Sequence, residues 1–116
     1  MLDASNRLRT AADFRQAVRR GRRAGGRLLV VHLDPANVDK ATSRSLRVGF
    51  VVAKSVGPAV SRNRVRRRLR HLVRERIAGL PADGLLVVRA LPESAAASYQ
   101  ELGSELDHCL GRVVAS

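Results

Sequence analysis

Arginine dominates one stretch of the chain, residues 54–76. After Ser61 this stretch holds eight arginines and a single acidic residue, Glu75. The planar guanidinium group of arginine can hydrogen-bond to two phosphate oxygens at once, and it also stacks on nucleobases. Solvated charged faces usually mix glutamate with lysine, whereas arginine is used here almost alone. The residue types therefore predict binding of a phosphate polyanion.

The same stretch carries the apolar period of an amphipathic helix. Its apolar stripe consists of Val65, Leu69, Leu72, Val73 and Ile77. Gly57 and Pro58 predict a turn before the helix, and Pro58 suits a helix start because its missing N–H would be unpaired there anyway. The polar residues that project away from the stripe are Arg64, Arg67, Arg68 and Arg74, with His71 among them and Arg66 and Arg70 on one flank. The amide of Asn63 can both donate and accept hydrogen bonds at a base edge or sugar.

Residues that could form a catalytic centre are sparse. Glu101 and Glu105 are an i,i+4 pair on a predicted helix, where we expect both carboxylates to be solvated. The single cysteine, Cys109, excludes an internal disulfide and any multi-cysteine zinc site, and we expect it to be a small buried apolar residue. The sequence thus predicts a binding protein without catalytic residues and without its own metal site.

Length and charge restrict the class of protein further. A chain of 116 residues predicts one domain, 1–116. A net charge of +12 and a pI of about 11.7 indicate an acidic partner, which is nucleic acid or an anionic membrane. A membrane partner is not expected, because no apolar run approaches the roughly 18 residues of a spanning helix and no signal peptide is found. We expect a cytoplasmic location.

The remaining segments predict the elements that support the arginine helix. They are a short helix from Thr10 that Gly21 can close, with Arg22 and Arg23 beside it, and strands at 27–33, 46–53 and 85–89. A last segment begins near Ser94, and a capping box at Ser98 and Glu101 opens its helix. Residues 34–44 read as a loop between antiparallel neighbours, and Gly49 suggests a bulge or a close approach. The predicted fold class is α+β, a two-layer sandwich of one mostly antiparallel sheet of about four strands with three helices, in the order α-β-β(-β)-α-β-α.

A longer pattern around Asn63 resembles a known family. Arg62-Asn63-Arg64, preceded by Gly57-x-Ala59-Val60 and followed by Val65-Arg66-Arg67-Arg68-Leu69-Arg70, resembles the RNR signature of the protein subunit of bacterial ribonuclease P. The resemblance extends to Arg47-Val48-Gly49 and Lys54, and towards the N-terminus to Asn6-Arg7-Leu8-Arg9, Asp13-Phe14 and Gly21. It covers the chain from about Arg7 to Tyr99 and beyond.

This resemblance implies more than the residues alone do. In that family the catalyst is an RNA with its Mg²⁺ ions, and the protein assists removal of the 5′ leader from precursor tRNA, so the chain would be a subunit of a ribonucleoprotein endoribonuclease. The residues that would contact the catalytic RNA are Lys54, Arg62, Asn63, Arg64, Arg66, Arg67 and Arg70. Phe14, Val18 and His32 stand where the family binds the leader, with Val18 at a position where an aromatic residue is common and His32 where a tyrosine is found. A left-handed crossover through the arginine helix is also implied.

Two other readings of the basic helix remain open from the residues themselves. The first is a ribosomal or general RNA-binding protein without an enzymatic partner, although such proteins commonly carry long basic tails and this chain ends in an acidic-leaning helix. The second is a DNA-binding regulator that places the helix in a major groove, although no second short helix at turn spacing and no heptad zipper accompany it. The expected partners are the catalytic RNA and precursor tRNA, without DNA.

Overall fold

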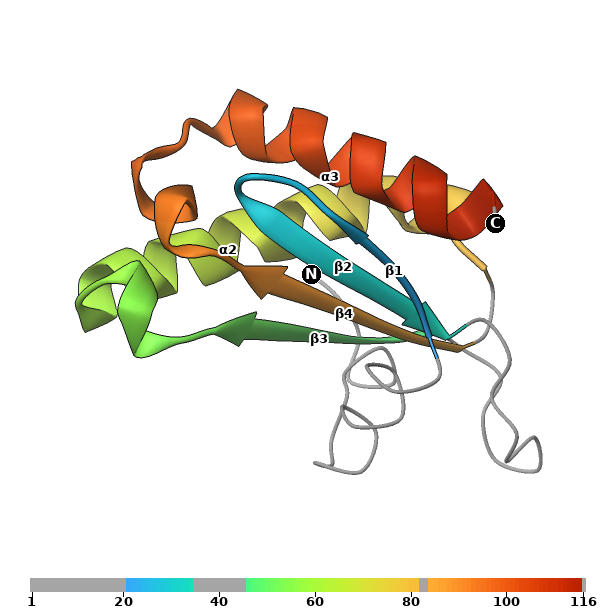
Figure 1. Cartoon of the computed structure of the whole chain (residues 1–116), viewed down its shortest axis with the longest axis horizontal. Helices are drawn as coiled ribbons and strands as arrows, with labels where there is room; N and C mark the ends of the chain where they lie inside the picture. Colours follow the sequence, from blue (N-terminus) through green and yellow to red (C-terminus); the bar gives the residue numbers. More distant parts are fainter. Residues whose placement is uncertain (1–20, 35–45, 82–83, 116) are drawn as a thin grey trace.

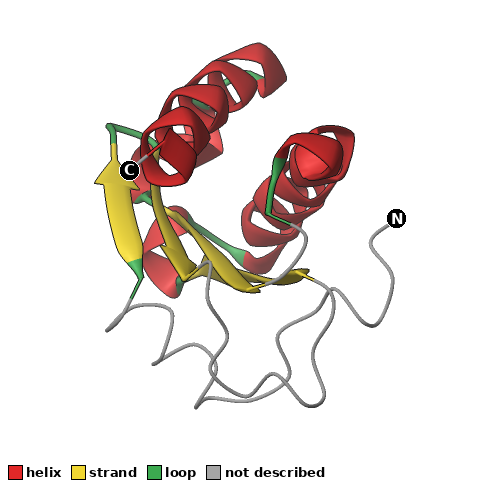
Figure 2. Cartoon of the chain, turned by 90° about the vertical axis from the view of Figure 1, so that its right-hand side faces the viewer, coloured by secondary structure: helices red, strands yellow, loops and turns green. Residues whose placement is uncertain are grey.

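The computed structural model describes residues 21–34, 46–81 and 84–115, which form a four-stranded sheet and two long helices. The strands are β1 (Arg22–Gly25), β2 (Leu29–Asp34), β3 (Leu46–Val52) and β4 (Gly84–Ala90), and the helices are α2 (Ala59–Arg76) and α3 (Tyr99–Ala115). Short 3₁₀ helices are η2 (Lys54–Val56), η3 (Ile77–Gly79) and η4 (Pro92–Ala96). Both long helices cover the same face of the sheet (Figure 1, Figure 2), which confirms the predicted α+β sandwich. The first predicted helix lies outside the described residues.

Strand β4 lies inside the sheet, whose order is β1-β2-β4-β3. β2 pairs antiparallel with β1 and β4, whereas β3 pairs parallel with β4, so α2 forms the crossover between two parallel strands. All residues of β4 except Arg89 are buried, which explains its interior position. The prediction that the strands flanking residues 34–44 are neighbours was wrong, because β4 inserts between β2 and β3.

Strand β1 is an addition to the predicted elements. The sequence pattern places Arg22 and Arg23 beside the first helix, but the structure pairs them with Leu33 and His32 of β2. β1 is an edge strand in which only Ala24 is buried, so it lacks the apolar alternation that marks a strand. A hydrogen bond of 2.9 Å from the Gly26 N–H to the Leu29 carbonyl closes the turn to β2.

The core lies between the sheet and the two helices. Alternate strand residues point into it, among them Leu29, Val31, Leu33, Val48, Leu86 and Val88. α2 contributes Val65, Leu69, Leu72 and Val73, as predicted, while Ile77 begins η3 and is half-buried. α3 contributes Leu102, Leu106, Leu110 and Val113, again as predicted. Because each such side chain gains about 1.5–3 kcal/mol on burial, these stripes determine which side of each helix faces solvent.

The start of α3 agrees with the prediction. The Ser98–Glu101 capping box is confirmed, since the Glu101 N–H donates to Ser98 Oγ at 3.0 Å and the Ser98 N–H donates to Glu101 Oε1 at 2.8 Å. Ser94 lies before the helix in η4 and donates its hydroxyl to the Leu91 carbonyl at 2.6 Å. The extended backbone at Ala97 separates η4 from α3.

Two smaller predictions are also tested. Cys109 is buried in the core, as predicted, and burial raises the pKa of its thiol. Gly49 pairs with Val87 in a ladder that is continuous from Leu46 to Val52, so of the two readings of Gly49 the bulge was wrong.

Candidate nucleic-acid interface

The outward side of α2 is cationic along most of its length. We call its exposed residues, Asn63, Arg64, Arg67, His71 and Arg74, the cationic face. From Arg64 to Arg74 this face spans about 15 Å at the 1.5 Å rise per residue of an α-helix. The buried stripe of Val65, Leu69, Leu72 and Val73 holds the opposite side of the helix against the core, so the cationic face is turned towards solvent.

Half-buried arginines of α2 form hydrogen bonds within the protein. Arg62 Nε donates to the Gly57 carbonyl at 3.1 Å, and an Arg66 guanidinium N–H donates to Asn63 Oδ1 at 3.2 Å. Arg68 donates to the Ala97 carbonyl at 3.1 Å, so it connects α2 to the segment before α3. The prediction that Arg68 projects outward with Arg64 and Arg67 was therefore wrong. The Ala97 carbonyl comes from 29 residues further along the chain, which no local period reveals.

Arg76 ties the end of α2 to α3. Its guanidinium group pairs with both carboxylate oxygens of Asp107, and it also donates to the Leu72 carbonyl at 2.9 Å. The hydrogen bond with Asp107 is the main cause that raises the pKa of Arg76. Gly103 allows this close approach, because an added Cβ there would lie 3.2 Å from Leu72 Cδ2 and 3.3 Å from an Arg76 nitrogen. Arg76 therefore has a structural role, because it joins α2 to α3.

We expect Asp107→Ala to lower the free energy of unfolding by about 1 kcal/mol, because a partly exposed charge-assisted hydrogen bond is lost. Denaturant unfolding measures this change. The cationic face does not include Arg76, so the salt dependence of RNA binding should stay as in the wild type. A reduced salt slope would place Arg76 among the RNA contacts instead.

The turn before α2 determines where Lys54 lies. Lys54 is exposed in η2, and Gly57 has a φ of +149°, which favours glycine. The Gly57 carbonyl accepts the Arg62 hydrogen bond, so the turn and the first part of α2 are connected. Lys54 therefore continues the positive charge of the cationic face beyond the N-terminus of the helix.

His32, the predicted leader contact that the structure describes, lies on the opposite side of the sheet. His32 alternates with Val31 and Leu33, which face the helices, so its side chain faces away from them. The buried residues Leu85 and Val87 form a second apolar cluster on that side. Phe14 and Val18, the other predicted leader contacts, lie outside the described residues. The structure therefore separates His32 from the cationic face by the sheet and the core.

His32 is buried, and its Nδ1 atom has no hydrogen-bond partner. Burial is the main cause that lowers the pKa of the imidazole, and the positive charges of Arg23 and Arg89 lower it further. Neither arginine was predicted as a site residue. Arg89 has a signal in the sequence, since it is the charged residue in the otherwise apolar strand β4.

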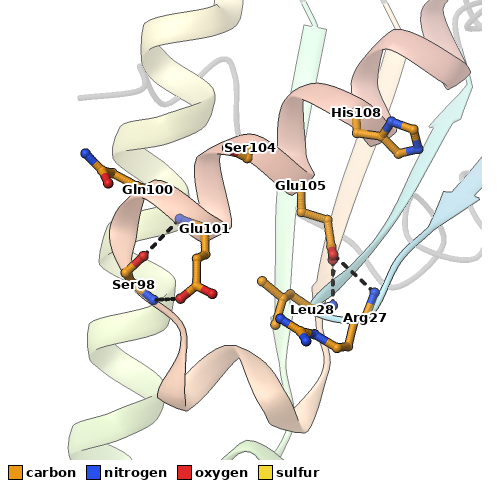
Figure 3. Close-up of a pocket in the computed structure, with 8 residues that line it drawn as sticks. All are labelled: Arg27, Leu28, Ser98, Gln100, Glu101, Ser104, Glu105 and His108. Carbon is orange, nitrogen blue, oxygen red and sulfur yellow. Dashed lines mark hydrogen bonds between the residues drawn. The ribbon is translucent and has the colours of Figure 1, made fainter.

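Glu105 has a structural role, although the sequence analysis expected its carboxylate to be solvated. Its carboxylate accepts hydrogen bonds from the backbone N–H groups of Arg27, Leu28 and Leu29, at 3.1, 2.6 and 2.5 Å. Figure 3 shows Glu105 pointing from α3 to the β1–β2 turn, with the capping box of Ser98 and Glu101 beside it. These residues line a groove of about 540 Å³. The expectation that Glu105 is solvated was wrong.

The described part of the chain was searched for metal-ligand clusters and for membrane-spanning helices. Among these residues no group of three or more His, Cys, Asp or Glu side chains is placed to hold a metal ion. No helix in the same ranges is both long enough and apolar enough to span a membrane. Fold and charge together define a class, a small α+β protein that presents an arginine-rich helix suited to phosphate groups.

Comparison with known proteins identifies the family within that class. The chain belongs to the ribonuclease P protein family, whose sequence pattern matches residues 2–114. It is 56% identical to the ribonuclease P protein component of a Nocardioides species over 113 residues, which is 97% of this chain and 95% of that protein. The corresponding protein of Acidothermus cellulolyticus is 50% identical over 113 residues, 97% of this chain and 92% of that one. Members of this family are the protein part of a ribonucleoprotein endoribonuclease of tRNA processing.

The fold agrees with this assignment. The structure of the Staphylococcus aureus RNase P protein superimposes with a TM-score of 0.79 at 24% identity, covering 94% of this chain and 97% of that one. The predicted resemblance to the ribonuclease P protein subunit is confirmed.

Proposed function

We propose that this protein binds the catalytic RNA of ribonuclease P and the 5′ leader of precursor tRNA, and so assists endonucleolytic removal of the leader in the cytoplasm. The observation that supports it best is the cationic face of α2, the helix that carries the RNR signature of the family to which the chain belongs. The contacts to the catalytic RNA would be Lys54, Arg62, Asn63, Arg64, Arg66, Arg67 and Arg70.

The exposed and half-buried residues of this set differ in the hydrogen-bond donors that they would offer to RNA. Arg64 and Arg67 are exposed, and their free N–H groups suit bidentate contacts with phosphate oxygens. Arg62 and Arg66 each use one N–H internally, which holds the side chain in place and leaves further donors for RNA. Asn63 accepts from Arg66 through Oδ1, so its amide NH₂ remains available to donate.

In this proposal the cleavage chemistry is supplied by the RNA partner. Mg²⁺ would be held mainly by that RNA. The protein would contribute phosphate neutralisation along α2, which lets two negatively charged RNAs approach each other. It would also bind the single-stranded leader at Phe14, Val18 and His32.

Reconstitution tests the proposal. The chain should be purified free of nucleic acid, combined with ribonuclease P RNA, and tested for affinity to a precursor tRNA and to the matching mature tRNA. We expect tight binding of the catalytic RNA and a preference for the precursor. Copurification with ribosomal RNA, without affinity for ribonuclease P RNA, would support a general RNA-binding protein, and preferential binding of duplex DNA would support a regulator.

A substitution at Phe14 tests the leader contact. If its ring stacks on an unpaired base, the contact contributes about 1–3 kcal/mol by substitution, and only a leader-bearing substrate loses it. We expect the Phe14→Leu variant to fold, to bind catalytic RNA as the wild type does, and to lose most of its preference for precursor over mature tRNA. Leucine retains most of the apolar volume, so a role in packing alone predicts an unchanged preference.

A further inference from the structure

Glu75 is the only acidic residue of α2, and it lies beside the cationic face. His71 precedes it by four residues and Arg74 by one. Residues four apart in a helix are neighbours on its surface, so the Glu75 carboxylate is within reach of the C-terminal end of that face. A carboxylate lying on the face would repel RNA phosphates and compete with them for the cations. The side chain of Glu75 is 63% exposed, so packing does not hold it elsewhere.

A hydrogen bond from α3 holds this carboxylate. Tyr99 is the first residue of α3, and its hydroxyl donates to Glu75 Oε1 at 3.1 Å. The same oxygen also lies 3.6 Å from a guanidinium nitrogen of Arg76. That nitrogen already donates to the Leu72 carbonyl, and the other two nitrogens of the group pair with Asp107. Among the described residues, Tyr99 therefore gives Glu75 the closer and better-directed of these two contacts.

The position of the Tyr99 hydroxyl is itself fixed by contacts on both sides. The capping box at the start of α3 sets the backbone of its first turn. Arg68 donates to the Ala97 carbonyl at 3.1 Å, so the segment just before Tyr99 is attached to α2. Arg68 and Glu75 are separated by about two helical turns and therefore lie on the same side of α2. The segment that Arg68 holds is thus placed to bring Tyr99 to Glu75.

We propose that Tyr99 is a positioning residue for RNA binding, whose hydroxyl holds the carboxylate of Glu75 on the α3 side of α2, away from the phosphates that the cationic face would bind. The inference rests on the proposed function, because it takes the cationic face as the contact with catalytic RNA. Tyr99 acts through Glu75 and does not touch the RNA in this arrangement. Neither residue is among those that the family resemblance assigns to RNA contact.

Loss of the hydroxyl frees the carboxylate. In Tyr99→Phe the ring remains, but Glu75 loses its hydrogen bond, and the positive charge of Arg74 and its neighbours draws it towards the cationic face. One exposed charge that comes within about 5–10 Å of a bound phosphate weakens binding on the order of threefold at low salt. The loss should be smaller at higher salt, because exposed charges are then screened.

Equilibrium binding of the full chain to ribonuclease P RNA tests this in the wild type, Tyr99→Phe, Glu75→Gln and the double variant. We expect Tyr99→Phe to bind the RNA about threefold more weakly at low salt. Glu75→Gln should bind at least as tightly as the wild type. Adding Tyr99→Phe to it should then have no further effect, because no carboxylate remains to be held. If Tyr99 served only in packing, or contacted the RNA directly, the loss would be the same with and without Glu75.

Glu93→Gln is the matched control for the removal of one negative charge. Glu93 is exposed in η4, and its carboxylate pairs with Arg27, in the turn between β1 and β2, at 3.4 Å. In the Glu93→Gln background, Tyr99→Phe should still weaken RNA binding on the order of threefold. Denaturant unfolding of each variant checks that all of them are folded under the conditions of the binding measurement.

The possible results separate this inference from the proposed function. An affinity of Tyr99→Phe equal to that of the wild type at low salt overturns the inference, and so does a loss that persists in the folded Glu75→Gln background. Both results leave the proposed function intact. A wild-type protein without affinity for ribonuclease P RNA contradicts the proposed function and the inference together.

Discussion

Replacing both Arg64 and Arg67 by alanine is expected to lower the affinity for ribonuclease P RNA on the order of 10²-fold. Both side chains are exposed on the cationic face and lack partners within the described residues, so they are free to contact phosphate. A hydrogen bond to a charged group contributes about 1.5–3 kcal/mol, and two such contacts at the lower end of this range give the expected loss. Equilibrium binding at several salt concentrations measures it. The slope of log K against log salt should fall by roughly 1.4–1.8, two contacts' worth.

A control variant should lower the net charge by the same amount as the double arginine variant, with no substitution in α2. Gln100→Glu together with Ser104→Glu also lowers the net charge by two units, because it adds two carboxylates at exposed positions of α3. We expect that variant to bind RNA nearly as well as the wild type, because long-range effects are screened within about 10 Å at 0.1 M salt. An equal loss in both variants would mean that net charge alone attracts the RNA. An unchanged slope in the arginine variant would mean that the cationic face is turned towards solvent in the particle.

Replacing Glu105 by alanine is expected to lower the free energy of unfolding by about 3–5 kcal/mol. Its carboxylate accepts three backbone N–H groups at the β1–β2 turn, two of which belong to the buried residues Leu28 and Leu29. Each hydrogen bond to a charged acceptor contributes about 1.5–3 kcal/mol, and the exposed N–H of Arg27 can turn to water instead. Denaturant unfolding with an unchanged m-value would establish this loss.

Gly26 provides the matched test of that contact. An added Cβ at Gly26 would lie 2.6–2.9 Å from the Glu105 carboxylate, so Gly26→Ala must displace the carboxylate from the turn. We therefore expect Gly26→Ala to destabilise the wild type strongly and the Glu105→Ala variant much less, a coupling that a double-mutant cycle measures. Additive effects would show that the carboxylate does not hold the turn. RNA affinity of the folded variants should be retained, because Glu105 lies outside the cationic face.

Sequence alone determined the features that depend on neighbours along the chain. The extent of α2 and its buried stripe follow from a 3.6-residue period, and the capping box at Ser98 and Glu101 is a local motif that forms as predicted. The exposed pair Arg64 and Arg67 follows from the same period, since it lies opposite the stripe. The family resemblance likewise rested on a continuous motif around Asn63.

Tertiary structure decided what depends on contacts between distant segments. β1 has a mostly polar sequence and is a strand because β2 pairs with it, and β4 separates β2 from β3 because its apolar residues need burial on both faces. Arg68 and Arg76 belong to the arginine-rich stretch, but their side chains are held by groups of the C-terminal segment. Glu105 looks solvated on its helix, yet it holds a turn more than 70 residues earlier. The period of a helix or strand describes one element at a time. Which acceptor pairs with an arginine, or which N–H groups pair with a carboxylate, depends on how several elements pack together.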